Sequence, residues 1–205
     1  MSSKTTTAAR AAASESYRVR VELQDIEPVI WRSVQVPASL SLAGLHKALQ
    51  IAMGWEDCHM HQFLADDGRC FGVADQELER RDHHGTSVGE VLRPGRELVY
   101  EYDFGDCWRH RLTVEEVVSD PVRQVLLLDG ARACPPEDAG GSDGFMDLLE
   151  FFDPESTCDM CEEEKEYGGE DQCTECWETR QWLGDFDPGE FRLARVAARL
   201  AKARL

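Results

Sequence analysis

The chain has 205 residues and a mass of 23.1 kDa, a length that predicts one domain with at most a small appendage. Its 22 basic and 40 acidic side chains give a formal net charge of -18, which argues against nucleic acid and anionic membranes as partners. The longest run of bulky apolar residues, 125–128, is far shorter than the roughly 20 residues of a membrane-spanning helix. We therefore expect a globular protein with no membrane contact.

The first 16 residues consist mainly of Ser, Thr and Ala and lack the bulky apolar block of a secretory signal. We expect residues 1–16 to form a disordered tail, with an organelle transit peptide as the alternative. Residues 17–205 are expected to form a single domain. Because we see no export signal, the sequence predicts a cytoplasmic protein whose eight cysteines bind metal or stay as buried thiols.

The domain is predicted to begin with two strands and a helix. Residues 17–23 alternate apolar and polar side chains with the period of a half-buried strand, and residues 29–36 repeat this pattern between two prolines. Residues 41–53 carry leucines at helical spacing. Ser41 is a good N-cap and Gly54 a good helix stop, so an amphipathic helix is expected between them.

A second hairpin is expected after this helix, with strands at residues 61–64 and 69–73 around Asp66-Asp67-Gly68. Residues 74–85 are polar and predict a loop. A single helical turn is expected within residues 87–92.

The remaining elements are three strands followed by helices. Residues 97–104, 111–118 and 124–128 are rich in Val, Leu, Tyr and Phe, as strands are. Residues 144–152 predict a helix, and apolar positions between 191 and 200 predict a final one. Strands followed by helices favour an α+β fold with a mixed or antiparallel sheet and packed helices.

Two Cys-x-x-Cys pairs, Cys158 with Cys161 and Cys173 with Cys176, are the strongest chemical signal. Four thiolates are soft ligands that bind Zn²⁺ tetrahedrally and close its coordination shell. The segment between the pairs has almost no apolar residue, so a metal would have to supply its folding energy. We expect a structural Zn²⁺ site in an inserted knuckle at residues 155–180. The alternatives are another thiophilic metal, a redox dithiol pair or unbound thiols.

Acidic side chains are concentrated around this knuckle. Residues 137–189 contain 18 acidic and 2 basic side chains. A phosphate backbone would be repelled there, so we interpret the knuckle as a protein-contact or stapling element. Residues 190–205 carry five basic side chains, which would complement a helix C-terminus; contact with nucleic acid is the alternative for this helix.

Two further segments combine titratable and aromatic side chains. In residues 102–110, strand spacing places Asp106, Trp108 and His110 on one face, and His59 and His61 share a face in the same way. The alternatives are a plain turn and histidines that pack within the fold. The two histidines with Asp103 or Asp106 are also candidates for a second metal site.

We expect these two segments to meet across the sheet and line one pocket. The expected ligand-binding residues are His59, His61, Asp106, Trp108 and His110. If the pocket is catalytic, the candidates are His59, His61, Asp103, Asp106 and His110.

Six motifs occur in a fixed order along the chain. They are Pro28-Val29-Ile30-Trp31-Arg32, Leu45-His46, Gly54-Trp55, His59-x-His61-x-Phe63, Tyr102-Asp103-Phe104-Gly105-Asp106-x-Trp108-x-His110 and Cys134-Pro135-Pro136-Glu137-Asp138-x-Gly140-Gly141. Together they resemble the Ri-plasmid open-reading-frame-three family over residues 17–200. The resemblance implies a compact α+β domain without a settled biochemical activity. Typical members lack the cysteine knuckle, which is therefore an insertion.

The expected function is that of a binding or adaptor module that contacts a protein or a small ligand. A hydrolytic or metal-assisted enzyme is the first alternative. A DNA-associated accessory protein of a plasmid or mobile element is the second, although the sequence shows no nucleophile framework for strand exchange and its charge disfavours DNA.

Overall fold

The structure is a computed structural model that describes residues 15–77, 79–152, 158–166 and 173–205. The expected disordered tail therefore lies outside the described residues except for Glu15 and Ser16. The strands are β1 (Ser16–Leu23), β2 (Trp31–Pro37), β3 (His61–Ala65), β4 (Cys70–Gly72), β5 (Arg80–Asp82), β6 (Glu97–Tyr102), β7 (Trp108–Val118) and β8 (Leu126–Ala131). The helices are α2 (Leu42–Met53), α3 (Val88–Val91), α4 (Gly141–Glu150), α5 (Asp159–Glu166), α6 (Thr174–Leu183) and α7 (Leu193–Leu200).

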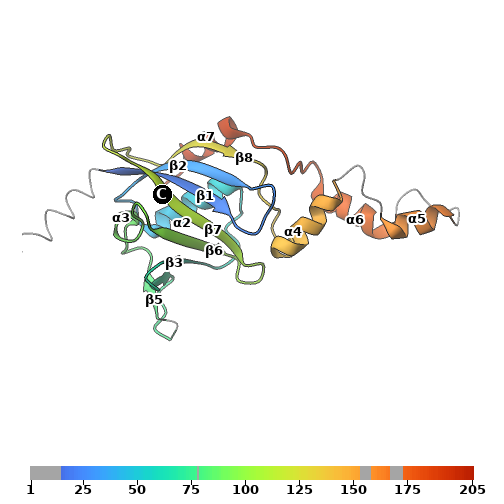
Figure 1. Cartoon of the computed structure of the whole chain (residues 1–205), viewed down its shortest axis with the longest axis horizontal. Helices are drawn as coiled ribbons and strands as arrows, with labels where there is room; N and C mark the ends of the chain where they lie inside the picture. Colours follow the sequence, from blue (N-terminus) through green and yellow to red (C-terminus); the bar gives the residue numbers. More distant parts are fainter. Residues whose placement is uncertain (1–14, 78, 153–157, 167–172) are drawn as a thin grey trace, which may run out of the picture.

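The eight strands form one twisted sheet in the order β5-β4-β3-β6-β7-β1-β2-β8 (Figure 1). The β4 and β5 pair is parallel, and the other neighbouring pairs are antiparallel. The predicted α+β fold with a mixed sheet and packed helices is confirmed. None of the helices in the described ranges has the length and apolar character needed to cross a bilayer.

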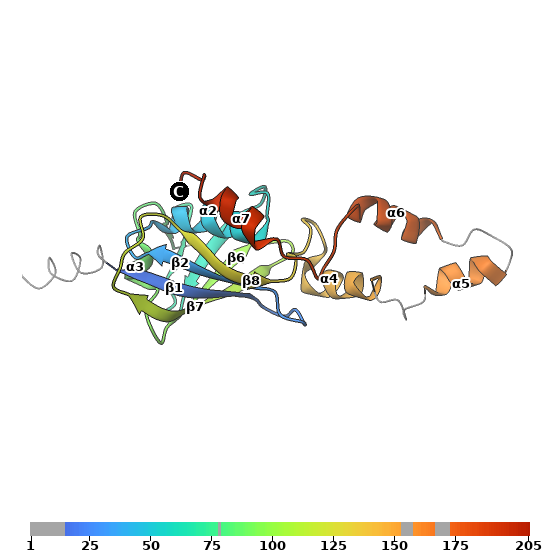
Figure 2. The same ribbon diagram turned by 90° about the horizontal axis from the view of Figure 1, so that it is seen from above.

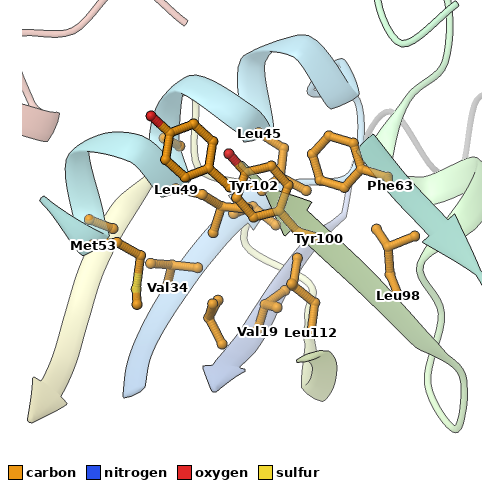
Figure 3. Packing of buried hydrophobic residues seen from close by; sticks show 14 of the residues in the cluster. Val19, Val34, Leu45, Leu49, Met53, Phe63, Leu98, Tyr100, Tyr102 and Leu112 are labelled. Atoms are coloured by element: carbon orange, nitrogen blue, oxygen red, sulfur yellow. The ribbon is translucent and has the colours of Figure 1, made fainter. Parts of the chain in front are cut away.

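The hydrophobic core lies between α2 and one face of the sheet (Figure 3). Leu45 and Leu49 of α2 are buried against Val19, Val34 and Leu112 from three central strands, and each is at most 2% exposed. The alternation of apolar and polar residues in β1 directs its valines into this core. The sheet therefore has apolar burial of its own that does not depend on the cysteine segment.

Helix α2 follows its sequence signals closely. The hydroxyl of Ser41 accepts a hydrogen bond from the Gly44 amide at 3.0 Å, which satisfies one of the free donors of the first turn. Gly54 ends the helix with a φ of 112°, a conformation that favours glycine. Both ends of the predicted helix are confirmed.

The structure differs from the sequence expectation at the sheet edge and in the cysteine segment. The expected loop at residues 74–85 contains the short edge strand β5, whose three residues are polar and gave no alternating pattern. The cysteine segment contains α5 and α6, which have few apolar side chains and hence no amphipathic period. Both elements were missed because their sequences lack an apolar face.

Helices α4, α5 and α6 extend away from the sheet, and we call them the helical arm (Figures 1 and 2). The chain then returns to the sheet, where α7 packs on α2 and β8 (Figure 2). The return point is fixed by Arg32, whose guanidinium lies 3.9 Å from the ring centre of Phe191 and donates to the carbonyls of Ala52 and Ala131. Both ends of the arm are thus attached to the sheet domain.

The contact between Arg32 and Phe191 requires a glycine at residue 130 in β8. A Cβ atom at residue 130 would lie 2.5 Å from the Phe191 ring and 2.9 Å from Arg32 Cδ. Gly130→Ala is therefore expected to lower the free energy of unfolding by about 1–3 kcal/mol in urea denaturation. The control Gly85→Ala, whose Cβ would meet only Asp82 at 3.6 Å, should stay within about 1 kcal/mol of the parent. Equal midpoints for the two variants would contradict this account.

Candidate functional site

Four cysteine sulfurs converge in the helical arm. Cys158 directly precedes α5 and Cys161 lies in its first turn, while Cys173 is the N-cap of α6 and Cys176 lies in its first turn. The four Sγ atoms all lie within 4.8 Å of one another, and those of Cys158 and Cys173 are 3.8 Å apart. Two sulfurs bonded tetrahedrally to one ion at about 2.3 Å are about 3.8 Å apart. The predicted cysteines therefore form one cluster that could hold a metal ion.

Backbone amides at the two helix starts point at these sulfurs. The Cys173 amide donates to Cys161 Sγ at 3.2 Å, and the Cys176 amide donates to Cys173 Sγ at 3.5 Å. The Cys161 amide lowers the pKa of Cys158, whereas desolvation raises the pKa of Cys176. Amide donors favour thiolates, but four thiolates in contact repel one another, so a cation is needed for all four to ionise.

A second group of ligand-type side chains surrounds His59. His59 precedes β3, Asp103 follows β6 directly, and Glu137 and Asp138 lie in the segment before α4. The Nε2 atom of His59 lies 3.7 Å from Asp103 Oδ2, 3.8 Å from Glu137 Oε2 and 3.5 Å from Asp138 Oδ1. We call these four residues the His59 cluster.

Hydrogen bonds fix the other carboxylate oxygens of this cluster. Glu137 Oε1 accepts from the Glu56 amide at 2.7 Å and from the Tyr102 hydroxyl at 3.1 Å. Asp103 Oδ1 accepts from the Gly105 amide at 2.8 Å. The remaining oxygens, Glu137 Oε2 and Asp103 Oδ2, are thereby directed toward His59.

His61 belongs to a different group. Its ring stacks on His46 with centroids 3.5 Å apart and faces His83 at 5.1 Å. His46 also bonds to the Tyr100 hydroxyl and to Asp57, both at 2.8 Å. Burial lowers the pKa of His61 to about 3, so it is a neutral ring at physiological pH. The structure thus brings His59 to Asp103, but places His61 in a stack of histidines.

The other expected pocket residues lie at different depths. Asp106 accepts a hydrogen bond from the Gly140 amide at 3.1 Å, at the start of the arm. Trp108 and His110 are fully buried, and Trp55 donates to His110 Nε2 at 3.4 Å. Burial lowers the pKa of His110 to about 4. A pocket shared by all five expected residues remains a prediction.

Sequence reasoning missed Glu137 and Asp138. The only local sign was an acidic pair directly after Pro135-Pro136, next to a glycine pair that sharply turns the chain. Gly140 and Gly141 both have positive φ, and a Cβ on Gly141 would lie 2.7 Å from the Asp106 carbonyl oxygen. The turn at Gly140 and Gly141 packs against the turn at Asp106, and this contact places Glu137 and Asp138 next to His59.

The fold is shared with a protein of unknown function. The structure resembles the crystal structure of a protein of unknown function, MM3350 from Methanosarcina mazei Go1, with a TM-score of 0.69 and 30% identity, covering 88% of this chain and 97% of that one. The uncharacterized protein y4hQ of Sinorhizobium fredii is 34% identical over 139 residues, which are 65% of this chain and 71% of the relative. The chain belongs to the family described as Plasmid pRiA4b ORF-3-like protein, which matches residues 15–195.

Proposed function

We propose that the chain is a binding module whose helical arm, held by a structural Zn²⁺ ion, docks a basic amphipathic segment of a partner protein. The observation that carries this proposal is the exposure of large apolar side chains within the acidic part of the chain. Met160 of α5 is 51% exposed, and Trp177 and Trp182 of α6 are 55% and 50% exposed. Trp55 and Trp108 in the sheet domain are buried.

Exposed tryptophans surrounded by carboxylates favour a partner that carries both apolar and basic side chains. Tryptophan is enriched among residues that dominate binding energies at protein interfaces. The surplus of 16 acidic over basic side chains in residues 137–189 would attract Lys and Arg and repel nucleic acid. An amphipathic segment with both cations and apolar side chains satisfies both features at once.

The four-cysteine cluster supports the zinc part of the proposal. Among the described side chains of α5 and α6, only Leu183 and the N-cap Cys173 are buried. Apolar burial therefore contributes little to holding these two helices together. Binding of Zn²⁺ by four thiolates would supply that free energy and would fix the tryptophans of α6 in place.

Binding is tested with a synthetic amphipathic Lys/Leu helix peptide, titrated into the zinc-loaded full chain by calorimetry. The double variant Trp177→Ala, Trp182→Ala is expected to raise the dissociation constant of the peptide at least about tenfold, because the apolar side chains that anchor the peptide are lost. Val73→Ala, which truncates a side chain that is 63% exposed but distant in sequence from the arm, serves as the matched control and should bind as the parent does.

Two results would contradict the proposal. One is peptide binding that is equal in the parent and the tryptophan variant. The other is equal binding of oligolysine, since that would reduce the interaction to charge alone. Binding of duplex DNA tighter than the usual non-specific range of about 10⁻⁴ to 10⁻⁶ M would instead favour a DNA-associated accessory protein.

A further inference from the structure

We infer that the His59 cluster is a second metal site, which takes one divalent cation of the Mn²⁺ class and is separate from the four-cysteine site. The proposal concerns His59, Asp103, Glu137 and Asp138. It does not depend on the docking function of the arm.

The first argument is the spacing of the donor atoms. His59 Nε2 lies 3.5 to 3.8 Å from one oxygen of each carboxylate, which is too long for direct hydrogen bonds. Ligand atoms at about 2.1 Å from a shared ion are about 3.0 to 3.4 Å apart in octahedral or tetrahedral geometry. The three separations from His59 Nε2 therefore need to shorten by less than about 1 Å around a shared ion. Donor atoms of His59, Asp103 and Asp138 all lie within 4.8 Å of one another, and Glu137 forms a second such group with His59 and Cys58.

The second argument is that two of these donor atoms are buried without a hydrogen-bond partner. His59 Nε2 and Glu137 Oε2 are inaccessible to solvent and make no hydrogen bond in the structure. Leaving a buried polar atom without a hydrogen bond is unfavourable, and more so when the atom is charged. Both atoms point into the same cluster, so one cation would satisfy both.

The third argument is charge. Three carboxylates meet at one imidazole, and within the described part of the chain the ion pairs of these carboxylates are with His59 alone. No Lys or Arg side chain of that part forms an ion pair with them. Like charges this close are unfavourable unless a cation or a proton is shared between them.

The donor set indicates the class of ion. One imidazole nitrogen with three carboxylate oxygens suits Mn²⁺ and its neighbours better than the soft ions that prefer thiolates. Asp138 is 78% exposed, so the site opens to solvent on that side and leaves room for bound water. Cys58 Sγ lies within 4.8 Å of His59 and Glu137 donor atoms and is a further candidate ligand.

The position of the site gives it a structural consequence. His59 and Asp103 belong to the sheet domain, whereas Glu137 and Asp138 lie three or four residues before α4 begins. A bound ion would therefore join the base of the helical arm to the ends of β3 and β6. It would act together with the Asp106 to Gly140 hydrogen bond at the same junction.

The site is tested by titrating Mn²⁺ into the full chain that already carries Zn²⁺, following the loss of the free-ion EPR signal. Thiolates hold zinc in preference to Mn²⁺, so this signal reports the carboxylate site. We expect one saturable Mn²⁺ per chain. The variant His59→Gln, Asp138→Asn should weaken its affinity at least about tenfold, because it removes one ligand and one charge.

The matched control is His84→Gln, Asp120→Asn, which makes the same chemical changes at exposed positions outside the cluster. It should bind Mn²⁺ as the parent does. The parent and control should also gain thermal stability from added Mn²⁺, and the cluster variant should not. Circular dichroism verifies that each variant is folded. The proposal fails if the parent shows no saturable binding below about 1 mM Mn²⁺, or if both double variants bind equally.

Discussion

Chelation of zinc from the full chain is expected to unfold α5 and α6 while the sheet stays folded. Among the described side chains of the two helices and their N-caps, only Cys173 and Leu183 are buried, so we expect the structure of these helices to depend on the free energy of metal binding. The sheet has its own core against α2, with Val19, Leu45 and Leu112 completely buried. The loss should therefore be local rather than global.

Hydrogen exchange measures this difference directly. After chelation, amides of α5 and α6 should exchange at least about 100-fold faster, whereas those of β1, β6 and β7 should keep their protection. The variant Cys161→Ser, Cys176→Ser should show the same local loss without a chelator and should carry no zinc. The control Cys70→Ser, Cys107→Ser changes two thiols outside the cluster and should retain one zinc per chain. Less than about half an equivalent of zinc in the parent would contradict the site.

Acidification from pH 7 to about 4.5 is expected to reduce the stability of the sheet domain strongly. Burial lowers the pKa of His61 to about 3 and that of His110 to about 4, and it also lowers the pKa values of His46 and His83. In the unfolded chain these side chains titrate near 6.5. Between these values the unfolded state binds protons that the folded state does not, so stability falls as the pH falls.

For His110 alone the effect corresponds to about 3 kcal/mol, fully present above pH 6.5 and lost as the pH approaches 4. Burial is the main cause of this shift, and the backbone hydrogen bonds of His110 only partly offset it. His110 Nδ1 lies 3.2 Å from the Tyr100 carbonyl oxygen and is the natural donor, while Nε2 accepts from Trp55. A second proton on Nε2 would face the Trp55 donor inside the core.

Urea denaturation at several pH values tests this account. His61→Phe keeps a flat ring between His46 and His83 but cannot be protonated, so its stability should depend less on pH than that of the parent. Val73→Ala truncates an exposed side chain that does not titrate and should leave the pH dependence unchanged. The account would be wrong if both variants and the parent lost stability equally between pH 7 and 4.5.

The fold was predictable where its signals are local. Ser41 and Gly54 define α2 because capping depends on a few neighbouring residues. The alternation in β1 identified a core face in the same way. Strand β5 and helices α5 and α6 were not predicted, since a polar segment gains its structure from pairing or from a metal rather than from its own periodicity.

The sites, too, were predictable where their residues are close in sequence and not where they meet only in the folded chain. The cysteine cluster was predictable because each Cys-x-x-Cys pair lies within a single turn, so spacing alone fixes two ligands. The His59 cluster was predicted only in part. Strand spacing suggested that His59 and His61 act together, but the tertiary packing turns His61 toward His46. Glu137 reaches His59 from 78 residues away in sequence, a distance that no local pattern encodes.

Because the helical arm is attached to the sheet domain at both ends, its length and content can change among members of the family. The arm leaves the sheet domain at Gly140, which is bonded to Asp106, and returns at Phe191, which stacks on Arg32. When both ends of a segment are fixed, each doubling of its length costs only about 0.6 kcal/mol in closure entropy. Phe145 of α4 belongs to the core, so we expect only the part of the arm beyond α4 to be gained, lost or exchanged with little effect on the sheet. Relatives that share the sheet domain are free to differ in what the arm carries.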